Sequence, residues 1–252
     1  MSAPIVLPPL GAPVDELWEV LLDLAEQADV PWTLIGGQMV LLHAIEHGTV
    51  PPQVSQDGDV IADVRAARGG LKRLVATLEA LGFTSAGIAP DGVAHRYRRP
   101  SRHPERPVII DLLAPEGVGE RADLTTTAPG RTIQVPGGTQ ALSRTELVTV
   151  EVGDRVGAIP RPTLLAAIVG KAAACGLPGD ASRHLRDLAL LCSIMDDPFV
   201  TAQQLTGKDG QRLKLAAALN EPNHPAWRLV PEHLRDQGRA AWAILTDLAT
   251  TT

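Results

Sequence analysis

The segment LIGGQMVLLHAIEHGTVPPQVSQDGDVIADV, Leu34–Val64, carries the main structural signals of the chain. Its apolar start ends at Gly36-Gly37, and a segment with helical spacing follows. Asp57 and Asp59 then stand one residue apart after a proline-containing loop. The segment suits two structures. One is a strand, turn and helix that lead into an acidic turn, and the other is a phosphate-binding turn followed by a pair of metal ligands.

The two aspartates fall in a partly alternating segment, 53–64, that predicts a strand. Residues two apart on a strand face the same side, so the carboxylates of Asp57 and Asp59 would lie side by side. Close carboxylates repel unless a proton or cation lies between them, and Mg²⁺ prefers a few such oxygens together with substrate phosphates. QDGD is also a good turn sequence, so the D-x-D pattern alone is a weak signal.

Asp111 lies within VIIDLL, where every neighbour is aliphatic. An ionised carboxylate is costly to bury in an apolar strand unless it is paired or bound to a metal. If this strand lies beside the strand of Asp57, three carboxylates converge. Such a site can hold two divalent ions, clamp a triphosphate and support an in-line displacement. A helix-capping position or a water-facing edge strand would explain Asp111 without any such site.

Gly36-Gly37 stands between the short strand predicted for 31–35 and the helix predicted for 38–47. Glycine lets the backbone approach a ligand closely, and the N-terminus of the next helix offers free N–H groups to a phosphate. Paired glycines are common in ordinary turns as well, so this signal needs the others beside it.

The order of the predicted elements indicates an α+β protein of two parts. Helices and strands are both predicted up to residue 160, with helices at 14–28, 38–47 and 65–81 and strands at 31–35, 53–64, 92–99, 106–115 and 147–159. After Pro162 only helical periodicity remains. We therefore predict a core domain over 14–160 and a helical domain over 161–252, preceded by an extended proline-rich arm.

Composition narrows the possible classes of protein. The chain has 252 residues, 44% hydrophobic and 21% charged, which is typical of a globular protein. The formal net charge of −6 argues against non-specific coating of nucleic acid. A local basic stretch, HRYRRPSRHPER from His95 to Arg106, holds five arginines and two histidines. It suits either a solvated loop or a contact to an RNA acceptor or a triphosphate.

The expected location is a reducing cytoplasm. Cys175 and Cys192 lack a CxxC partner, so they give no zinc or redox signature. The N-terminal segment has no basic region typical of a signal peptide. No apolar run approaches the roughly 18–20 residues that span a bilayer, so we expect no membrane partner.

Taken together, these features resemble the nucleotidyltransferase superfamily with a polymerase-beta-like core. They are the strand–GG–helix order, SQDGDV and VIIDLL. The later segments AHRY, LLAAIVGKAAACG and SRHLRDLALL resemble more narrowly the AbiEii-type nucleotidyltransferase toxins of bacterial toxin–antitoxin systems. The resemblance covers residues 14–195 approximately. It implies a mixed-sheet nucleotidyltransferase core followed by a C-terminal helical domain.

The resemblance also implies a nucleotide-binding role for five residues. Gly36 and Gly37 would hold the nucleotide phosphates, and Ser55 stands where the family has Thr or Ser. Lys171 would contact the triphosphate, which suits a flexible ammonium group. Asp187 would orient Lys171 or contact the nucleotide. Simpler interpretations are that Lys171 extends to solvent and that Asp187 forms an ordinary helix pair four residues after an arginine.

Asp57, Asp59 and Asp111 would bind Mg²⁺, and Asp111 would accept the proton of the attacking hydroxyl. The implied activity is Mg²⁺-dependent transfer of a nucleoside monophosphate from an NTP to a hydroxyl of tRNA or of a protein. The protein would be a toxin, neutralised by a separately encoded antitoxin.

Two other functions remain open. The family usually has an aliphatic residue where Gly58 separates the aspartates, and glycine softens a strand. This difference favours a catalytically degenerate nucleotide-binding or regulatory protein. The acidic net charge would also suit a nucleotidyltransferase for cationic small molecules such as aminoglycosides.

Overall fold

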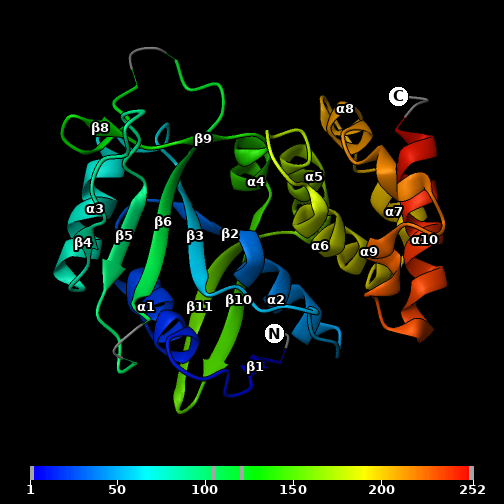
Figure 1. Cartoon of the computed structure of the whole chain (residues 1–252), viewed down its shortest axis with the longest axis horizontal. Coiled ribbons are helices and arrows are strands. Elements are labelled where there is room, and N and C mark those ends of the chain that lie inside the picture. The colour runs from blue at the N-terminus through cyan, green and yellow to red at the C-terminus, as the bar shows by residue number, and fades with distance from the viewer. Residues whose placement is uncertain (1–2, 104–105, 120–121, 250–252) are drawn as a thin grey trace. The chain divides into compact units, whose positions relative to one another are not determined.

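The structure is a computed structural model that describes residues 3–103, 106–119 and 122–249 (Figure 1). The chain divides into two compact units: Met1–Met39 with Val54–Pro162, and Val40–Gln53 with Thr163–Thr252. Strands of the described residues end at Pro162, and helices follow. The predicted α+β class with a mixed sheet is confirmed.

The main sheet of the first unit has the strand order β2-β3-β6-β5-β4. Its strands are β2 (Trp32–Ile35), β3 (Asp57–Ala62), β6 (Val108–Pro115), β5 (Arg96–Arg99) and β4 (Thr84–Ser85). The central strands β3 and β6 run parallel, whereas β2 and β5 run antiparallel to their neighbours. A short strand, β9 (Gln134–Val135), continues the pairing at the end of β6.

One face of the main sheet is covered by helix α1 (Val14–Gln27). Leu17 of this helix lies over Gly58, and Ile110 of the adjacent strand borders the same contact. The alternate residues Val60 and Leu112 are fully buried. This apolar packing fixes the parity of β3, so Asp57 and Asp59 must face the other side.

The opposite face of the main sheet is apolar at one end of β3 and β6 and charged further along these strands. Ile61 of β3 and Leu113 of β6 form an apolar cluster with Ala141 of α4 (Gly138–Ser143). Two residues before each of them, the same face carries Asp59 and Asp111. Helix α4 thus covers the apolar end of this face, and the charged residues lie beyond it.

Gly58 has a packing role in this arrangement. A Cβ at this position would lie 3.1 Å from Leu17 Cδ1, closer than an ordinary contact, and Leu17 is fully buried. We therefore expect Gly58→Val to lower the free energy of unfolding by about 1–3 kcal/mol through overpacking. Urea denaturation would measure this loss. The double variant Leu17→Ala/Gly58→Val should be less destabilised than the two single changes predict when summed, and strict additivity would contradict the contact.

Two further segments differ from their prediction. The helix predicted for 65–81 begins only at Gly70, as α3 (Gly70–Ala80). Before it, Asp63 Oδ1 accepts the backbone N–H groups of Arg65 and Ala66, which favours a turn over a helix. The short helix α4 was not predicted, because the two glycines at its start, Gly137 and Gly138, resemble a turn.

A second, three-stranded sheet also belongs to the first unit. It consists of β1 (Ile5–Leu7), β10 (Thr145–Val152) and β11 (Arg155–Pro162) in the order β1-β10-β11. Strand β1 pairs parallel to β10, so part of the predicted extended arm is a strand. The strands predicted for 147–159 form one hairpin that is longer at both ends. A small pair, β7 (Thr125–Thr127) and β8 (Gly130–Arg131), lies in the loop region that follows β6.

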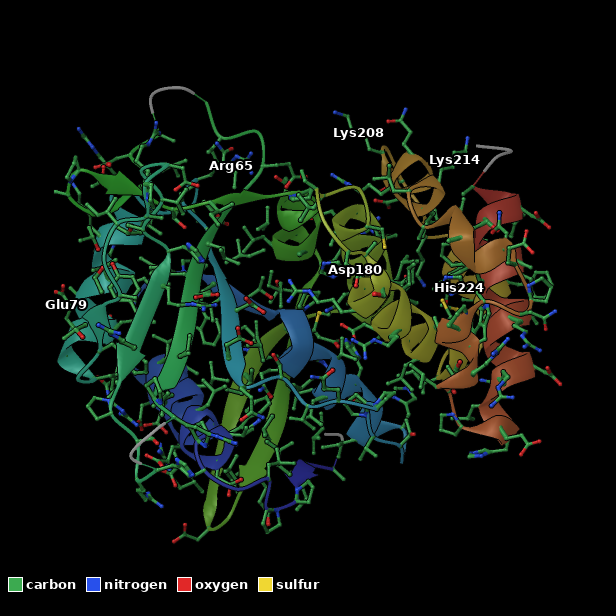
Figure 2. The ribbon with its side chains drawn as sticks, viewed as in Figure 1. Arg65, Glu79, Asp180, Lys208, Lys214 and His224 are labelled. Carbon is green, nitrogen blue, oxygen red and sulfur yellow. The ribbon has the colours of Figure 1, made fainter. Side chains whose placement is uncertain are left out.

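The second unit is helical in its described residues. Its helices after the sheet region are α5 (Leu164–Ala174), α6 (Ser182–Ser193), α7 (Pro198–Ala202), α8 (Asp209–Lys214), η1 (Ala217–Asn220), α9 (Pro225–Arg228) and α10 (Glu232–Leu248). Helix α6 packs against α5 and α10. Trp227 and Trp242 are buried in this unit, whereas Lys208 and Lys214 at α8 are exposed (Figure 2).

Within the described ranges, none of the helices combines the length and the hydropathy that a bilayer span requires.

Candidate functional site

The structure brings the three predicted carboxylates together on one face of the main sheet. Asp59 and Asp111 are direct partners across the parallel β3–β6 ladder, and Asp57 lies two residues before Asp59 on the same face. Asp111 is almost fully buried, with 8% of its side chain exposed, whereas 33% of the Asp57 side chain is exposed. Strand β6 has neighbours on both sides, so Asp111 is not an edge-strand residue.

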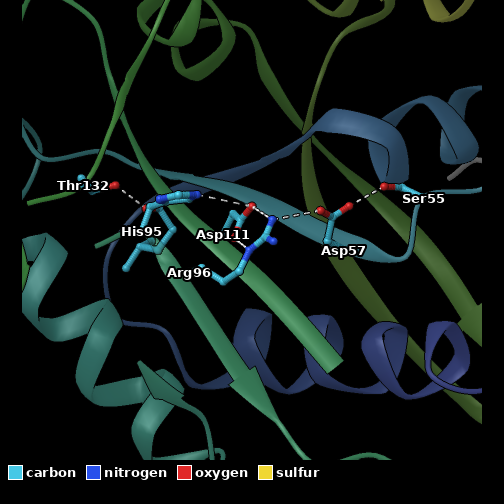
Figure 3. Close-up of polar contacts among 7 residues, drawn as sticks. Ser55, Asp57, His95, Arg96, Asp111 and Thr132 are labelled. Atoms are coloured by element: carbon cyan, nitrogen blue, oxygen red, sulfur yellow. Dashed lines mark hydrogen bonds and ion pairs between the residues drawn. The ribbon is translucent and has the colours of Figure 1, made fainter. Parts of the chain in front are cut away.

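The guanidinium of Arg96 lies between the carboxylates of Asp111 and Asp57 (Figure 3). Its Nε donates to Asp111 Oδ1 at 2.8 Å, and its Nη2 donates to Asp111 Oδ2 at 2.7 Å. The same Nη2 lies 3.4 Å from Asp57 Oδ2. This fork-to-fork geometry is the strong, bidentate form of an arginine–carboxylate pair. It follows from strand register, because Arg96 is the direct partner of Asp111 across the antiparallel β5–β6 ladder.

The negative charges of all three aspartates act on Arg96. The hydrogen bond to Asp111 raises the pKa of Arg96 above its usual value, and the negative charges of Asp111, Asp57 and Asp59 raise it further, against an opposing effect of burial. The guanidinium therefore remains charged and offsets part of the repulsion among the carboxylates. His95 adds a weaker contact, with its Nε2 at 3.8 Å from Asp111 Oδ2.

The arginines of the basic stretch His95–Arg106 make contacts in different places. Arg99 lies over Phe83, with 5.4 Å between its guanidinium carbon and the ring centroid. Arg102 pairs with Glu19 of α1 at 3.2 Å. Positions 104 and 105 of the stretch lie outside the described residues. The stretch was predicted as either a solvated loop or a contact to RNA or triphosphate, whereas its Arg96 enters the carboxylate cluster.

The glycine turn lies directly against this cluster. Gly36 is the first residue of α2 (Gly36–Glu46) and has φ +70°, a conformation that favours glycine. A Cβ on Gly36 would lie 1.8 Å from Asp59 Oδ2, so any side chain there would displace the carboxylate. This contact arises because Ile35 and Asp59 are partners across the β2–β3 ladder.

Ser55 connects the second glycine to the first aspartate. A Cβ on Gly37 would lie 2.5 Å from the Ser55 Cβ, so the two backbones approach closely. The Ser55 hydroxyl donates to Asp57 Oδ1 at 2.5 Å, and Gln38 Nε2 donates to the Ser55 carbonyl at 2.8 Å. Gly36, Gly37, Ser55, Asp57 and Asp59 therefore form one continuous set of contacts.

Lys171 and Asp187 belong to the second unit and contact each other. Lys171 Nζ donates to Asp187 Oδ2 at 2.6 Å, and only 8% of the lysine side chain is exposed. Lys171 therefore does not extend to solvent. Burial, followed by the positive charges of Lys171 and Arg183, lowers the pKa of the nearby His184 to about 4. The nucleotide-binding roles of Lys171 and Asp187 stay a prediction.

The carboxylate cluster fits a divalent ion in part. In the described part of the chain, no three His, Cys, Asp or Glu side chains are arranged as a metal-binding set. Both oxygens of Asp111 accept hydrogen bonds from Arg96. Asp57 and Asp59 still present hard oxygen donors beside the glycine turn, which suits Mg²⁺ with water and phosphate as its other ligands. Asp111 as a metal ligand stays a prediction.

Comparisons with known proteins identify the fold. No protein-family model matches the chain, and no curated protein matches its sequence significantly. An antigenic nucleotidyltransferase-like protein from Paracoccidioides brasiliensis is 13% identical, with a TM-score of 0.53 over 86% of this chain and 94% of that chain. This similarity shows that the chain has a nucleotidyltransferase-like fold.

A second solved structure is a STING-associated CdnE c-di-GMP synthase from Capnocytophaga granulosa. It is 11% identical, and the match covers 94% of this chain and 79% of that chain with a TM-score of 0.26. A TM-score at that level supports no inference about the chain.

Proposed function

We propose that the protein is a Mg²⁺-dependent nucleotidyltransferase. It moves a nucleoside monophosphate from an NTP to an acceptor hydroxyl and releases pyrophosphate. The observation that carries the proposal is the contact of Gly36 with Asp59. This contact joins a side-chain-free turn at a helix N-terminus to paired carboxylates, in a chain with a nucleotidyltransferase-like fold.

The glycine turn is the proposed site for the triphosphate. Backbone N–H groups at the start of α2 can donate to phosphate oxygens, and the helix dipole favours their negative charge. Gly36 and Gly37 carry no side chains, which lets this backbone lie close to Asp59 and Ser55. Ser55 holds Asp57 in place through its hydroxyl, so the first carboxylate is oriented before any ligand binds.

Asp57 and Asp59 would hold a Mg²⁺ ion, which would neutralise phosphate charge when bound. Asp111 would accept the proton of the attacking hydroxyl. Each carboxylate oxygen has a second lone pair, so the two hydrogen bonds from Arg96 do not exhaust its acceptor capacity. Arg96 holds the carboxylate in one orientation.

The resemblance of AHRY, GKAAACG and RHLRD to the AbiEii-type toxins supports a more specific role. We propose a cytoplasmic toxin that modifies tRNA or a protein and is neutralised by an antitoxin protein.

Arg96 also favours a second candidate, a catalytically degenerate nucleotide-binding protein. Its guanidinium occupies the space beside Asp111 that a divalent ion would need. Gly58, in contrast, gives this candidate no support, because it faces α1 on the other side of the sheet.

A labelling experiment separates the two candidates. The protein is incubated with each α-³²P-labelled NTP, Mg²⁺, total tRNA and cell lysate, beside an Asp59→Asn variant. Label that the wild type transfers to RNA or protein, and the variant does not, supports the transferase. If the wild type binds NTP and transfers no label, the degenerate candidate replaces it.

A further inference from the structure

Arg96 is a positive charge built into a site made of negative ones. It comes from β5, and the carboxylates come from β3 and β6, so the sheet itself sets their spacing. Asp57, Asp59 and Asp111 carry three negative charges when ionised, and Arg96 contributes one positive charge. Carboxylates on adjacent strand positions repel unless cations offset them. The guanidinium thus does electrostatically what a bound cation would do.

The position of Arg96 is specific within the cluster. It donates two hydrogen bonds to Asp111 of β6, and its Nη2 lies 3.4 Å from Asp57 Oδ2. The glycine turn contacts the cluster on the β3 side, at Asp59. The space next to Asp111 is therefore occupied by a side chain, whereas the side that borders the proposed phosphate site is formed by Asp57 and Asp59.

We infer that Arg96 takes the place of one of two divalent ions, so that the protein binds a single divalent ion at Asp57 and Asp59. The inference rests on the proposed function, because it specifies the ion content of that same site. Three convergent carboxylates would otherwise suit two ions.

Displacement of Arg96 by a second ion is unfavourable for two reasons. The bidentate pair is formed by directly opposed residues on neighbouring strands, and the planar guanidinium is preorganised to bind a carboxylate. Asp111 is also nearly fully buried, so an ion that replaced the guanidinium would have to give up bound water, which Mg²⁺ does reluctantly. A fixed guanidinium has a further chemical consequence. It donates hydrogen bonds but does not coordinate an attacking oxygen, so removal of the proton would depend on Asp111.

Counting Mn²⁺ ions tests the inference without any assay of activity. Mn²⁺ is titrated into the protein at neutral pH, and the unbound ion is measured by electron paramagnetic resonance. We expect one ion per chain for the wild type and two for Arg96→Gln. The matched control is Arg98→Gln, which removes the same charge from the same strand. Within the described residues, the Arg98 side chain contacts no carboxylate. The Arg98→Gln variant should therefore still bind one ion.

Several outcomes would overturn the inference. Two ions in the wild type, or one ion in a folded Arg96→Gln variant, would show that the guanidinium does not exclude an ion. Circular dichroism checks the fold of each variant, and the wild-type count is decisive even if Arg96→Gln does not fold. No bound Mn²⁺ in any variant would also count against the proposed Mg²⁺-dependent function, whereas two ions in the wild type would leave that function intact.

Discussion

Replacing Asp57 or Asp59 with asparagine should reduce kcat/KM for nucleotidyl transfer by about 10³-fold or more. A metal ion contributes several kcal/mol of charge stabilisation in the transition state, and each 1.36 kcal/mol corresponds to about a tenfold change in rate. Asparagine keeps the size of the side chain but removes the charge that would hold the ion. Initial rates of label transfer at varied NTP concentration would measure the effect.

Asp63 provides a matched control for this prediction. It is an aspartate just beyond the end of the same strand, and its carboxylate accepts the N–H groups of Arg65 and Ala66. The side-chain oxygen of asparagine can accept the same two bonds, so Asp63→Asn should keep wild-type kcat/KM. Equal losses in the Asp59→Asn and Asp63→Asn variants would indicate a general effect of charge and would contradict the metal role.

The second large effect is expected on stability. Replacing Lys171 with methionine should lower the free energy of unfolding by about 2–3 kcal/mol, because it leaves Asp187 without its cation in a mostly buried position. This is below the usual cost of breaking a fully buried pair, since 22% of the Asp187 side chain is exposed. Urea denaturation followed by far-UV circular dichroism would measure the loss.

Two further variants separate structure from function at this pair. Lys171→Met/Asp187→Leu should recover most of the stability, because an apolar pair of similar volume often replaces a buried ion pair without loss. Lys214→Met removes an exposed lysine and should change stability by about 0.5 kcal/mol or less. If the double variant is stable but transfers no label, the pair has the predicted role towards the nucleotide. Stability that stays low in the double variant would contradict the ion-pair explanation.

Local sequence patterns predicted much of the fold and the shared face of the three aspartates. Alternation on a strand placed Asp57 and Asp59 on one face, and the cost of burying a charge identified Asp111 within VIIDLL. The glycine pair was assigned to a strand–helix turn, which the structure shows at Gly36. Each of these features depends on neighbours within a few positions along the chain.

Features that depend on distant pairing were missed. Arg96 was not distinguished from the other arginines of its stretch, because only the β5–β6 register makes it the partner of Asp111. The interpretation of Gly58 as a sign of a degenerate site had the same origin. Leu17, which fills the space beside Gly58, lies on a separate helix. Strand β1 was not predicted because prolines flank its three residues and its partner lies far along the chain.

The built-in guanidinium also has an expected consequence for folding. A sheet that brings three carboxylates together would fold with difficulty if it had to wait for an external cation, and small metal-dependent domains do remain unfolded until their ion arrives. Here the neutralising charge belongs to Arg96 on the neighbouring strand, so it is in place when the sheet forms. A newly synthesised chain can therefore complete its core in the absence of divalent ions. Under the proposed function, binding of the ion would then follow folding.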